Sequence, residues 1–235
     1  MGSRRMTRRH FLAASGTLAA VFTAAGTTGL LFQREAVGEE EGAGISPVED
    51  LMREHGVLRR LLFVYENWIY RLTLQGEEKT GSLFEAANII RSFVEEYHEK
   101  LEEDYVFPVM KKAGQMADLV NTLFVQHQAG RRLTENVLRM SGRGTVRDTA
   151  GRTGLSNCLV QFIRMYRPHA AREDTVLFPA FRGVVGQDEY DRLGDLFEKK
   201  EDSLFGEKGF ERVVGRVATI EKVLGIYDLA QFTPQ

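Results

Sequence analysis

Cysteine and proline are both rare in this chain of 235 residues, which contains one cysteine and five prolines. The single thiol, Cys158, excludes an intramolecular disulfide, a zinc site made of cysteines and a cysteine-ligated cluster. Because Cys158 stands among apolar residues, we interpret it as a small buried side chain rather than a reactive thiol. The low proline content is compatible with a protein made of long helices.

Acidic residues outnumber basic residues outside the N-terminus. Residues 1–34 hold five arginines and no acidic residue, so the rest of the chain has 26 of the 31 basic residues against 33 acidic ones, a net charge of −7. A protein that binds nucleic acid needs a basic face to neutralise phosphates. We therefore expect no nucleic-acid partner.

The N-terminus has the composition of a targeting segment. The stretch TRRHFL, from Thr7 to Leu12, resembles a twin-arginine export signal, and a weakly apolar stretch follows to about Phe32. A short membrane anchor is the alternative, and it is compatible with such a signal. We expect residues 1–34 to be this segment and residues 35–45 to be a polar linker. The protein would then be exported, would be periplasmic or anchored facing outward, and would contact the membrane only through its N-terminus.

The remainder of the chain predicts helices. Ser46, Pro47 and Glu49 form a helix start, in which Ser46 caps the end and Glu49 completes a capping box. Apolar residues then recur at alternating steps of three and four, and no stretch shows a sustained period of two. Breakers such as QGEEKTG, KKAGQ and SGRG separate the periodic segments. We predict an all-α fold: an up-down antiparallel four-helix bundle over residues 46–185 with a C-terminal helical extension over residues 186–235.

Four histidines lie on the apolar stripes, one on each predicted helix of the bundle: His55, His98, His127 and His169. A single histidine in such a place is more often a hydrogen-bonded core residue than a ligand. The first two are 43 residues apart and the last two are 42 apart, so loops of similar length would bring all four to one level. We expect them to meet in one layer of the bundle.

A longer motif is written twice. HEKLEEDYVFP begins at His98 and HAAREDTVLFP begins at His169, 71 residues later. Each contains a histidine, a glutamate four residues on, and Phe-Pro at the ninth and tenth positions after the histidine. Histidine and glutamate at this spacing share a helix face, which adds Glu102 and Glu173 to the histidine layer. The stretches HGVLRRL and HQAGRRL, in the first and third helices, also repeat, so the two halves of the bundle are related.

The repeat predicts that each half supplies ligands for one of two metal ions. Imidazoles and carboxylates that converge in a bundle core suit iron, with zinc and manganese as competitors. Without a cation, burying the two glutamates would be costly.

These motifs resemble the hemerythrin-like family, also called the His-His-Glu cation-binding domain, over roughly residues 46–185. The resemblance rests on the pair Glu54-His55, the doubled motif and the third-helix histidine. It implies a non-haem di-iron centre that binds dioxygen or reacts with oxygen, nitric oxide or peroxide, without separating a carrier from an enzyme. The metal ligands that the resemblance implies are His55, His98, Glu102, His127, His169 and Glu173.

The sequence departs from the oxygen carriers of this family in the third helix. The carriers have a second histidine one turn after the first, where this chain has Arg131. Gly130 stands where the related first helix has Leu58, so we expect a pocket at Gly130 and Arg131 and a more open centre. Tyr97 and Tyr166 are candidates for redox-active or hydrogen-bonding groups beside it.

The last carboxylate is a second departure. In the carriers it lies five residues after its histidine, which corresponds to Asp174 in this chain. We prefer Glu173 because it repeats Glu102. We interpret Asp174 and Glu103 as solvated or hydrogen-bonded carboxylates.

Three other readings stay open. A ferritin-like di-iron oxidase is suggested by Glu95 and His98, which form Glu-x-x-His, but this motif should recur on a second helix, and Tyr166 stands three residues before His169. A non-catalytic iron store or sensor module is the second reading, although no output domain for a sensor is visible. A purely structural helical protein is the third, and the doubled motif disfavours it.

Overall fold

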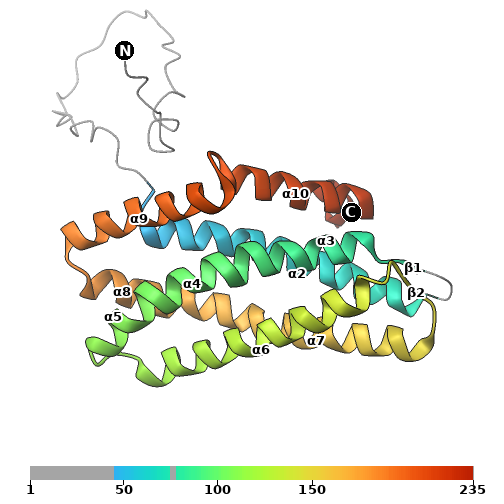
Figure 1. The fold of residues 1–235 in the computed structure, drawn as a ribbon, viewed down its shortest axis with the longest axis horizontal. Coiled ribbons are helices and arrows are strands. Elements are labelled where there is room, and N and C mark those ends of the chain that lie inside the picture. The colour runs from blue at the N-terminus through green and yellow to red at the C-terminus, as the bar shows by residue number, and fades with distance from the viewer. Residues whose placement is uncertain (1–44, 75–77, 235) are drawn as a thin grey trace, which may run out of the picture. The chain divides into compact units, whose positions relative to one another are not determined.

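The computed structural model describes residues 45–74 and 78–234 (Figure 1). The export signal predicted over residues 1–34 lies outside the described residues, and so does the predicted linker except for its last residue. Both therefore stay predictions. Among the described residues, no helix is long and apolar enough to cross a membrane.

Four long helical segments account for most of the described chain, so the all-α prediction is confirmed. The first segment is α2 (Pro47–Thr73), which begins directly after the predicted cap. The second consists of α3 (Gly81–Ile89), η2 (Ile90–His98), α4 (Glu99–Leu101), η3 (Glu102–Val106) and α5 (Phe107–Lys112). The third is α6 (Ala117–Ser141), and the fourth consists of α7 (Thr149–Arg172), η4 (Glu173–Leu177) and α8 (Phe178–Val184).

The C-terminal part adds α9 (Gln187–Phe205), α10 (Gly209–Leu224) and a 3₁₀ turn, η5 (Leu229–Phe232). The helix α8 ends at Val184 and α9 begins at Gln187. Two short strands, β1 (Glu78–Lys79) and β2 (Thr145–Val146), pair antiparallel and join two of the connecting loops.

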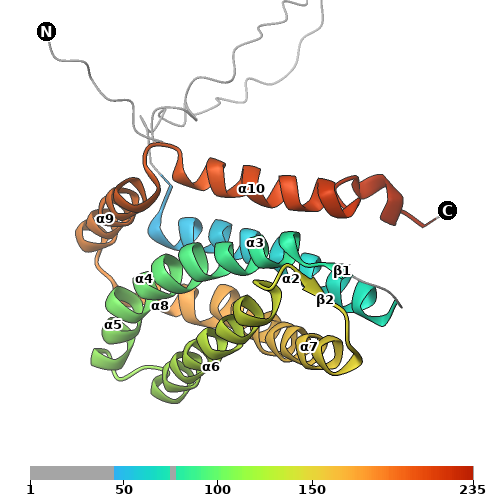
Figure 2. The same ribbon diagram turned by 45° about the vertical axis from the view of Figure 1, so that its right-hand side comes forward.

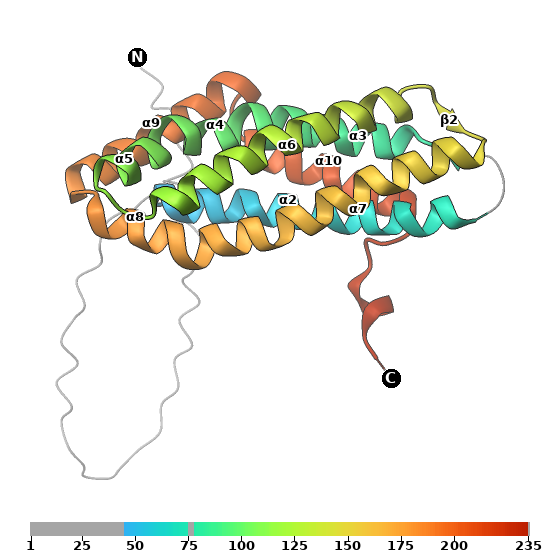
Figure 3. The ribbon, with the colours of Figure 1, turned by 90° about the horizontal axis from the view of Figure 1, so that it is seen from below.

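The four long segments pack around a common interior. The first segment, α2, contacts both α7 and η2, while α6 contacts α7 and α3. Figure 3 shows α2, α6 and α7 running side by side. Figure 2 shows α10 lying along the side of α2 and α3, and α9 also contacts α2. The C-terminal helices therefore cover one side of the long segments.

Large aromatic side chains fill the interior, and each one stabilises the fold by roughly 1.5–3 kcal/mol through its burial. Cys158 is only half-buried and packs against the edge of this core. The largest fully buried side chains are Trp68, Tyr65, Tyr97, Tyr166, Phe93, Phe162, Phe178, Phe181 and Phe197.

Three stretches of the second and fourth segments are wound as π-helix. The segment η2 ends at His98, η3 begins at Glu102 and η4 begins at Glu173. The last two are each followed by the Phe-Pro pair, whose proline has no backbone N–H to donate to the turn before it. A π turn accommodates this loss, and such turns are frequent at functional sites. The repeated proline thus accounts for a change of helical winding that starts at each glutamate.

Candidate metal centre

The six predicted ligands lie together in the interior. Ligand atoms of Glu102, His127, His169 and Glu173 all lie within 4.8 Å of one another, and so do those of His55, His98 and Glu102. All six residues are buried, and none is more than 4% exposed. We call His55 and His98 the first histidine pair, and His127 and His169 the second histidine pair.

The Nε2 atoms of the four histidines face the two glutamates. Oε2 of Glu102 lies 3.7 Å from Nε2 of His98 and 3.4 Å from Nε2 of His127. Oε2 of Glu173 lies 3.4 Å from Nε2 of His55 and 3.1 Å from Nε2 of His169. Oε2 of each glutamate therefore faces one histidine of each pair, so each carboxylate lies between the two pairs.

The opposite ring nitrogen of each histidine contacts a polar side chain outside the cluster. Nδ1 of His55 lies 2.6 Å from Oδ1 of Asp174, and Nδ1 of His98 lies 2.7 Å from Oε2 of Glu54. In the second pair, Nδ1 of His127 lies 3.1 Å from Glu103 and Nδ1 of His169 lies 2.9 Å from Gln126. Such partners fix the ring orientation and leave Nε2 available to a metal.

The sequence interpretation of Asp174 and Glu103 as hydrogen-bonded carboxylates agrees with these contacts. It missed Gln126 altogether, and it recognised Glu54 only as part of the pair with His55. Their positions in the sequence could have identified both residues, because Glu54 and Gln126 each stand directly before a histidine of the layer.

The phenylalanine of the doubled motif stacks on a histidine ring. Phe178 lies 5.6 Å from the ring of His55 with an interplanar angle of 18°, and Phe107 lies 5.4 Å from His127 at 20°. Each copy of the motif thus supplies a histidine and a glutamate, and its phenylalanine packs on a histidine of another segment. The first copy packs on the third long segment and the second copy packs on the first. This contact gives a physical reason for the repetition of the whole motif.

Two arginines complete the outer contacts. Arg59 pairs with Asp174, the carboxylate that holds His55. Arg131 lies 2.7 Å from Glu103 and 2.8 Å from Glu99. Arg131, which replaces the second third-helix histidine of the carriers, therefore binds carboxylates that surround His127.

Charge in this interior is poorly compensated by the protein alone. Burial and the neighbouring charge of Glu173 raise the pKa of Glu102 well above its usual range. Burial opposes the charge on His55, but hydrogen bonds to Asp174 and Glu173 outweigh it and raise its pKa to about 9. Burial lowers the pKa of His127 to about 4 despite its contact with Glu103.

These donors fit a pair of divalent cations. The Oε1 atoms of Glu102 and Glu173 are buried and have no hydrogen-bond donor within the described part of the chain. Four imidazoles and two carboxylates in such a place suit a first-row transition metal, and a cation would offset the cost of burying the carboxylates.

The open pocket predicted at Gly130 is wrong, because Tyr166 fills the space. A Cβ atom on Gly130 would lie only 1.9 Å from Oη of Tyr166. Arg131 lies beside this contact and binds Glu99 and Glu103, as described above. The ring of Tyr97, which was expected beside the pocket, packs against Phe93 and Phe205.

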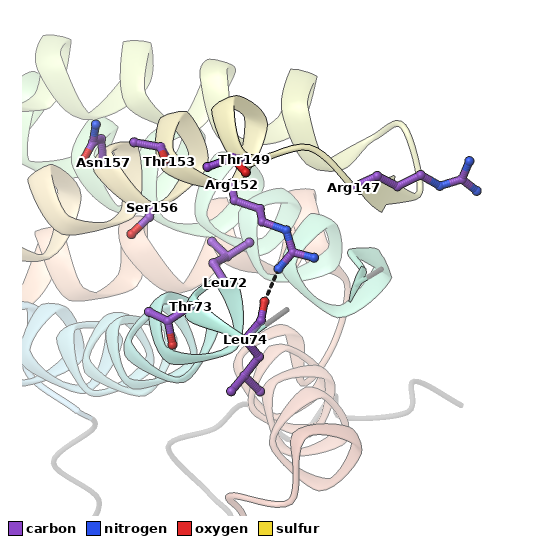
Figure 4. Close-up of a pocket in the computed structure, with 9 residues that line it drawn as sticks. All are labelled: Leu72, Thr73, Leu74, Arg147, Thr149, Arg152, Thr153, Ser156 and Asn157. Carbon is purple, nitrogen blue, oxygen red and sulfur yellow. Dashed lines mark hydrogen bonds between the residues drawn. The ribbon is translucent and has the colours of Figure 1, made fainter. Parts of the chain in front are cut away.

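A surface pocket of about 550 Å³ lies where α2 ends and α7 begins (Figure 4). Arg152 reaches across it and donates to the carbonyl of Leu74. None of the six predicted ligands lines this pocket, so we assign it no part in the metal centre.

Comparison with known proteins agrees with the site. The hemerythrin HHE cation binding domain matches residues 46–181. Uncharacterized proteins of Mycobacterium bovis and of two strains of Mycobacterium tuberculosis are 44% identical over 231 residues, which cover 97% of this chain and 91% of each relative. No solved structure matches this chain.

Proposed function

Because the chain belongs to the hemerythrin HHE cation-binding domain family, whose domains bind metal ions and usually iron, we propose that it is a non-haem di-iron protein. Its reaction partner would be dioxygen or another small oxidant such as nitric oxide or peroxide. We also propose that the four long helical segments form an up-down bundle around this centre, which matches the contacts between them.

Each residue of the cluster has a part in this proposal. The first histidine pair would hold one iron ion and the second pair the other, and Glu102 and Glu173 would supply carboxylate donors to both. The iron ions, when bound, supply the electrons that dioxygen or a peroxide accepts. The protein orients the imidazoles through their Nδ1 partners and excludes water by packing Phe107 and Phe178 on two of the rings.

The observation that carries the proposal is the position of the two glutamates. A carboxylate that faced histidines of one pair only would favour two separate sites. Here each carboxylate faces a histidine of both pairs at 3.1–3.7 Å, which supports one shared centre rather than two separate sites. Zinc and manganese remain competing metals for these donors.

The alternatives lack such an observation. A ferritin-like oxidase needs a second Glu-x-x-His, and Tyr166 occupies the position where its glutamate would stand. An iron store or sensor module fits the same ligands. A sensor would also need an output domain. The described residues after the fourth long segment form α9, α10 and η5, and both α9 and α10 pack on α2.

Location and partners belong to the proposal as well. We propose export by the twin-arginine route, on the basis of Arg8 and Arg9 followed by Phe11 and Leu12. Replacing Arg8 and Arg9 by lysines should then leave the protein in the cytoplasm, whereas the same change at Arg4 and Arg5 should not. We propose no nucleic-acid partner, because the chain beyond residue 34 is acidic.

Metal analysis tests the function directly. The full chain, expressed with iron and purified without oxygen, should contain two iron ions per chain. Its optical spectrum should change when air is admitted, because the ferrous centre is oxidised. A chain that holds zinc in preference to iron, or one whose spectrum does not respond to air or peroxide, would contradict the proposal.

A further inference from the structure

Tyr166 contacts a histidine of the second pair and also holds a carboxylate. It lies on α7 three residues before His169, and its ring packs edge-on against the His169 ring at 5.2 Å. Its side chain is 1% exposed, and its Oη donates a hydrogen bond of 2.6 Å to Oε1 of Glu99. A phenol and a carboxylate are thus held together in the interior, next to a proposed metal ligand.

The neighbouring helix is shaped around this hydroxyl. A Cβ atom on Gly130 would lie 1.9 Å from Oη and 2.7 Å from two carbons of the Tyr166 ring. Glycine inside a helix costs about 1 kcal/mol relative to alanine. The glycine therefore admits the hydroxyl at a cost to the stability of α6, and the close approach fixes Oη against the helix.

The carboxylate that accepts the hydrogen bond is fixed as well. Oε2 of Glu99 lies 2.8 Å from Nη2 of Arg131, which also holds Glu103. Oε1 of Glu99 is therefore directed at Oη of Tyr166 by a second contact on the other carboxylate oxygen. Burial raises the pKa of Glu99 and makes its ionised form a strong base, while the charge of Arg131 favours that ionised form. Proton transfer needs donor and acceptor at hydrogen-bond distance, and this pair satisfies that condition.

The related positions on the other side of the centre do not repeat the pair. The repeat places Leu58 where α6 has Gly130, Glu95 where α7 has Tyr166, and Ala170 where α4 has Glu99. The contacts that orient the histidines occur on both sides. The hydrogen-bonded pair of Tyr166 and Glu99 is therefore not needed to orient the predicted ligands.

We propose that Tyr166 is a redox-active residue that gives one electron to the metal centre while its hydroxyl proton moves to Glu99. This inference rests on the proposed di-iron function. It assigns Tyr166 a part in the reaction of the centre with a peroxide, whose reduction to water takes two electrons, one from Tyr166 and one from the metal centre.

The step balances as follows. The Oη–H bond of Tyr166 breaks, one electron leaves the ring, and the proton forms an O–H bond at Oε1 of Glu99. A neutral phenoxyl radical and a protonated Glu99 result. The oxidant is a peroxide, whose O–O bond breaks when it takes this electron, a second electron from the iron and two solvent protons to give two water molecules.

Tyr65 provides the matched comparison. It is also fully buried in the interior, yet its Oη has no hydrogen-bond partner within the described chain. Oxidation of such a tyrosine would leave a positive charge on a buried ring, which is costly. Tyr166 combines burial, contact with a ligand histidine and a fixed proton acceptor, and Tyr65 lacks a proton acceptor, so Tyr65 should stay unoxidised.

Electron paramagnetic resonance on the iron-loaded full chain tests the inference. After rapid mixing with hydrogen peroxide and freezing, the unmodified protein should show an organic radical whose hyperfine pattern changes when the protein contains ring-deuterated tyrosine. The signal should be lost in Tyr166→Phe and kept in Tyr65→Phe. In Glu99→Gln, which keeps an acceptor but cannot take the proton, the yield should fall by about tenfold or more.

Iron content and the ferrous optical change, measured on each variant, separate the two claims. A chain without iron overturns the proposed function and this inference with it. Iron-loaded protein that consumes peroxide but forms no tyrosine radical overturns the inference alone. A radical of equal yield in Tyr166→Phe does the same, because another residue would then be the donor.

Discussion

The two histidine pairs have the same outer layout but different electrostatics. In each pair one histidine contacts a carboxylate five residues after the motif histidine, which is Asp174 for His55 and Glu103 for His127. The other histidine contacts the residue that precedes the first or third histidine. That residue is Glu54 for His98, a carboxylate, and Gln126 for His169, an uncharged amide.

This difference distinguishes two effects of an outer partner: it orients the imidazole ring, and it changes the basicity of the imidazole. Carboxylate and amide oxygens both accept from an imidazole N–H, so either one can fix the ring. The carboxylate makes the imidazole more basic than the uncharged amide does. We therefore expect the first histidine pair to hold its metal ion more tightly than the second pair does.

The largest expected effect comes from removing one ligand of either pair. His98→Ala and His169→Ala should both lose iron and lower the melting temperature, because metal binding is coupled to folding. At a metal concentration of about 1,000 times Kd, the lost stabilisation is roughly 4 kcal/mol. Metal analysis and thermal unfolding measure both quantities. Arg164→Ala, an exposed change on the same helix as His169, is the control. Iron content unchanged in either histidine variant would disprove the shared centre.

The pH dependence of the metal-free protein is the next effect. The raised pKa of His55 means that its charge stabilises the fold below its unfolded pKa of about 6.5, and that this stability is lost as pH rises through about 9. His127, whose pKa is lowered to about 4, behaves in the opposite way, and its contribution is present above about 6.5 and lost as pH falls through about 4.

The free energy of unfolding, measured in urea from about pH 4 to about pH 10, should fall both at the alkaline and at the acidic end of this range. Asp174→Asn should weaken the alkaline decline, because the carboxylate that holds the proton on His55 is gone. The same decline in Asp174→Asn as in the unmodified protein would show that His55 is not its source.

A smaller effect should follow from exchanging the two outer partners. Glu54→Gln should weaken metal binding at the first histidine pair by about 10–100-fold, as is usual for a changed outer partner. Gln126→Glu should strengthen binding at the second pair. Titration of the metal-free protein against a coloured chelator resolves the two steps. If Glu54→Gln binds as tightly as the unmodified protein, charge at this position has no part in the difference between the pairs.

The smallest effect concerns the glycines of the two related helices. Gly130→Ala should destabilise the protein by about 1–2 kcal/mol, because the new methyl group meets the hydroxyl of Tyr166. Gly56 on α2 has nothing within 4 Å of a built Cβ, so Gly56→Ala should stabilise by up to about 1 kcal/mol. Denaturant unfolding of the two variants measures this opposition. A stabilising Gly130→Ala would remove the argument for close packing there.

The meeting of the four histidines and two glutamates could be predicted from the sequence, because helical periodicity is a local property. Each histidine lies on an apolar stripe, and the histidine-glutamate spacing places both side chains on one face. The contact of Gln126 with His169 could not be predicted, since it joins α6 to α7 and depends on how far the helices are rotated. The same holds for Tyr166. Its hydroxyl fills the space beside Gly130 because α6 and α7 approach closely there. The sequence shows only that Gly130 has no side chain, and it therefore predicts a pocket at a place that Tyr166 occupies.

Anomalous diffraction at the iron edge, on crystals of the iron-loaded chain, tests the central claim most directly. The account predicts two iron peaks, one beside His55 and His98 and the other beside His127 and His169, with Glu102 and Glu173 contacting both. A single peak, or iron bound elsewhere, such as the buried acidic group of Asp50, Glu54 and Glu201, would contradict it.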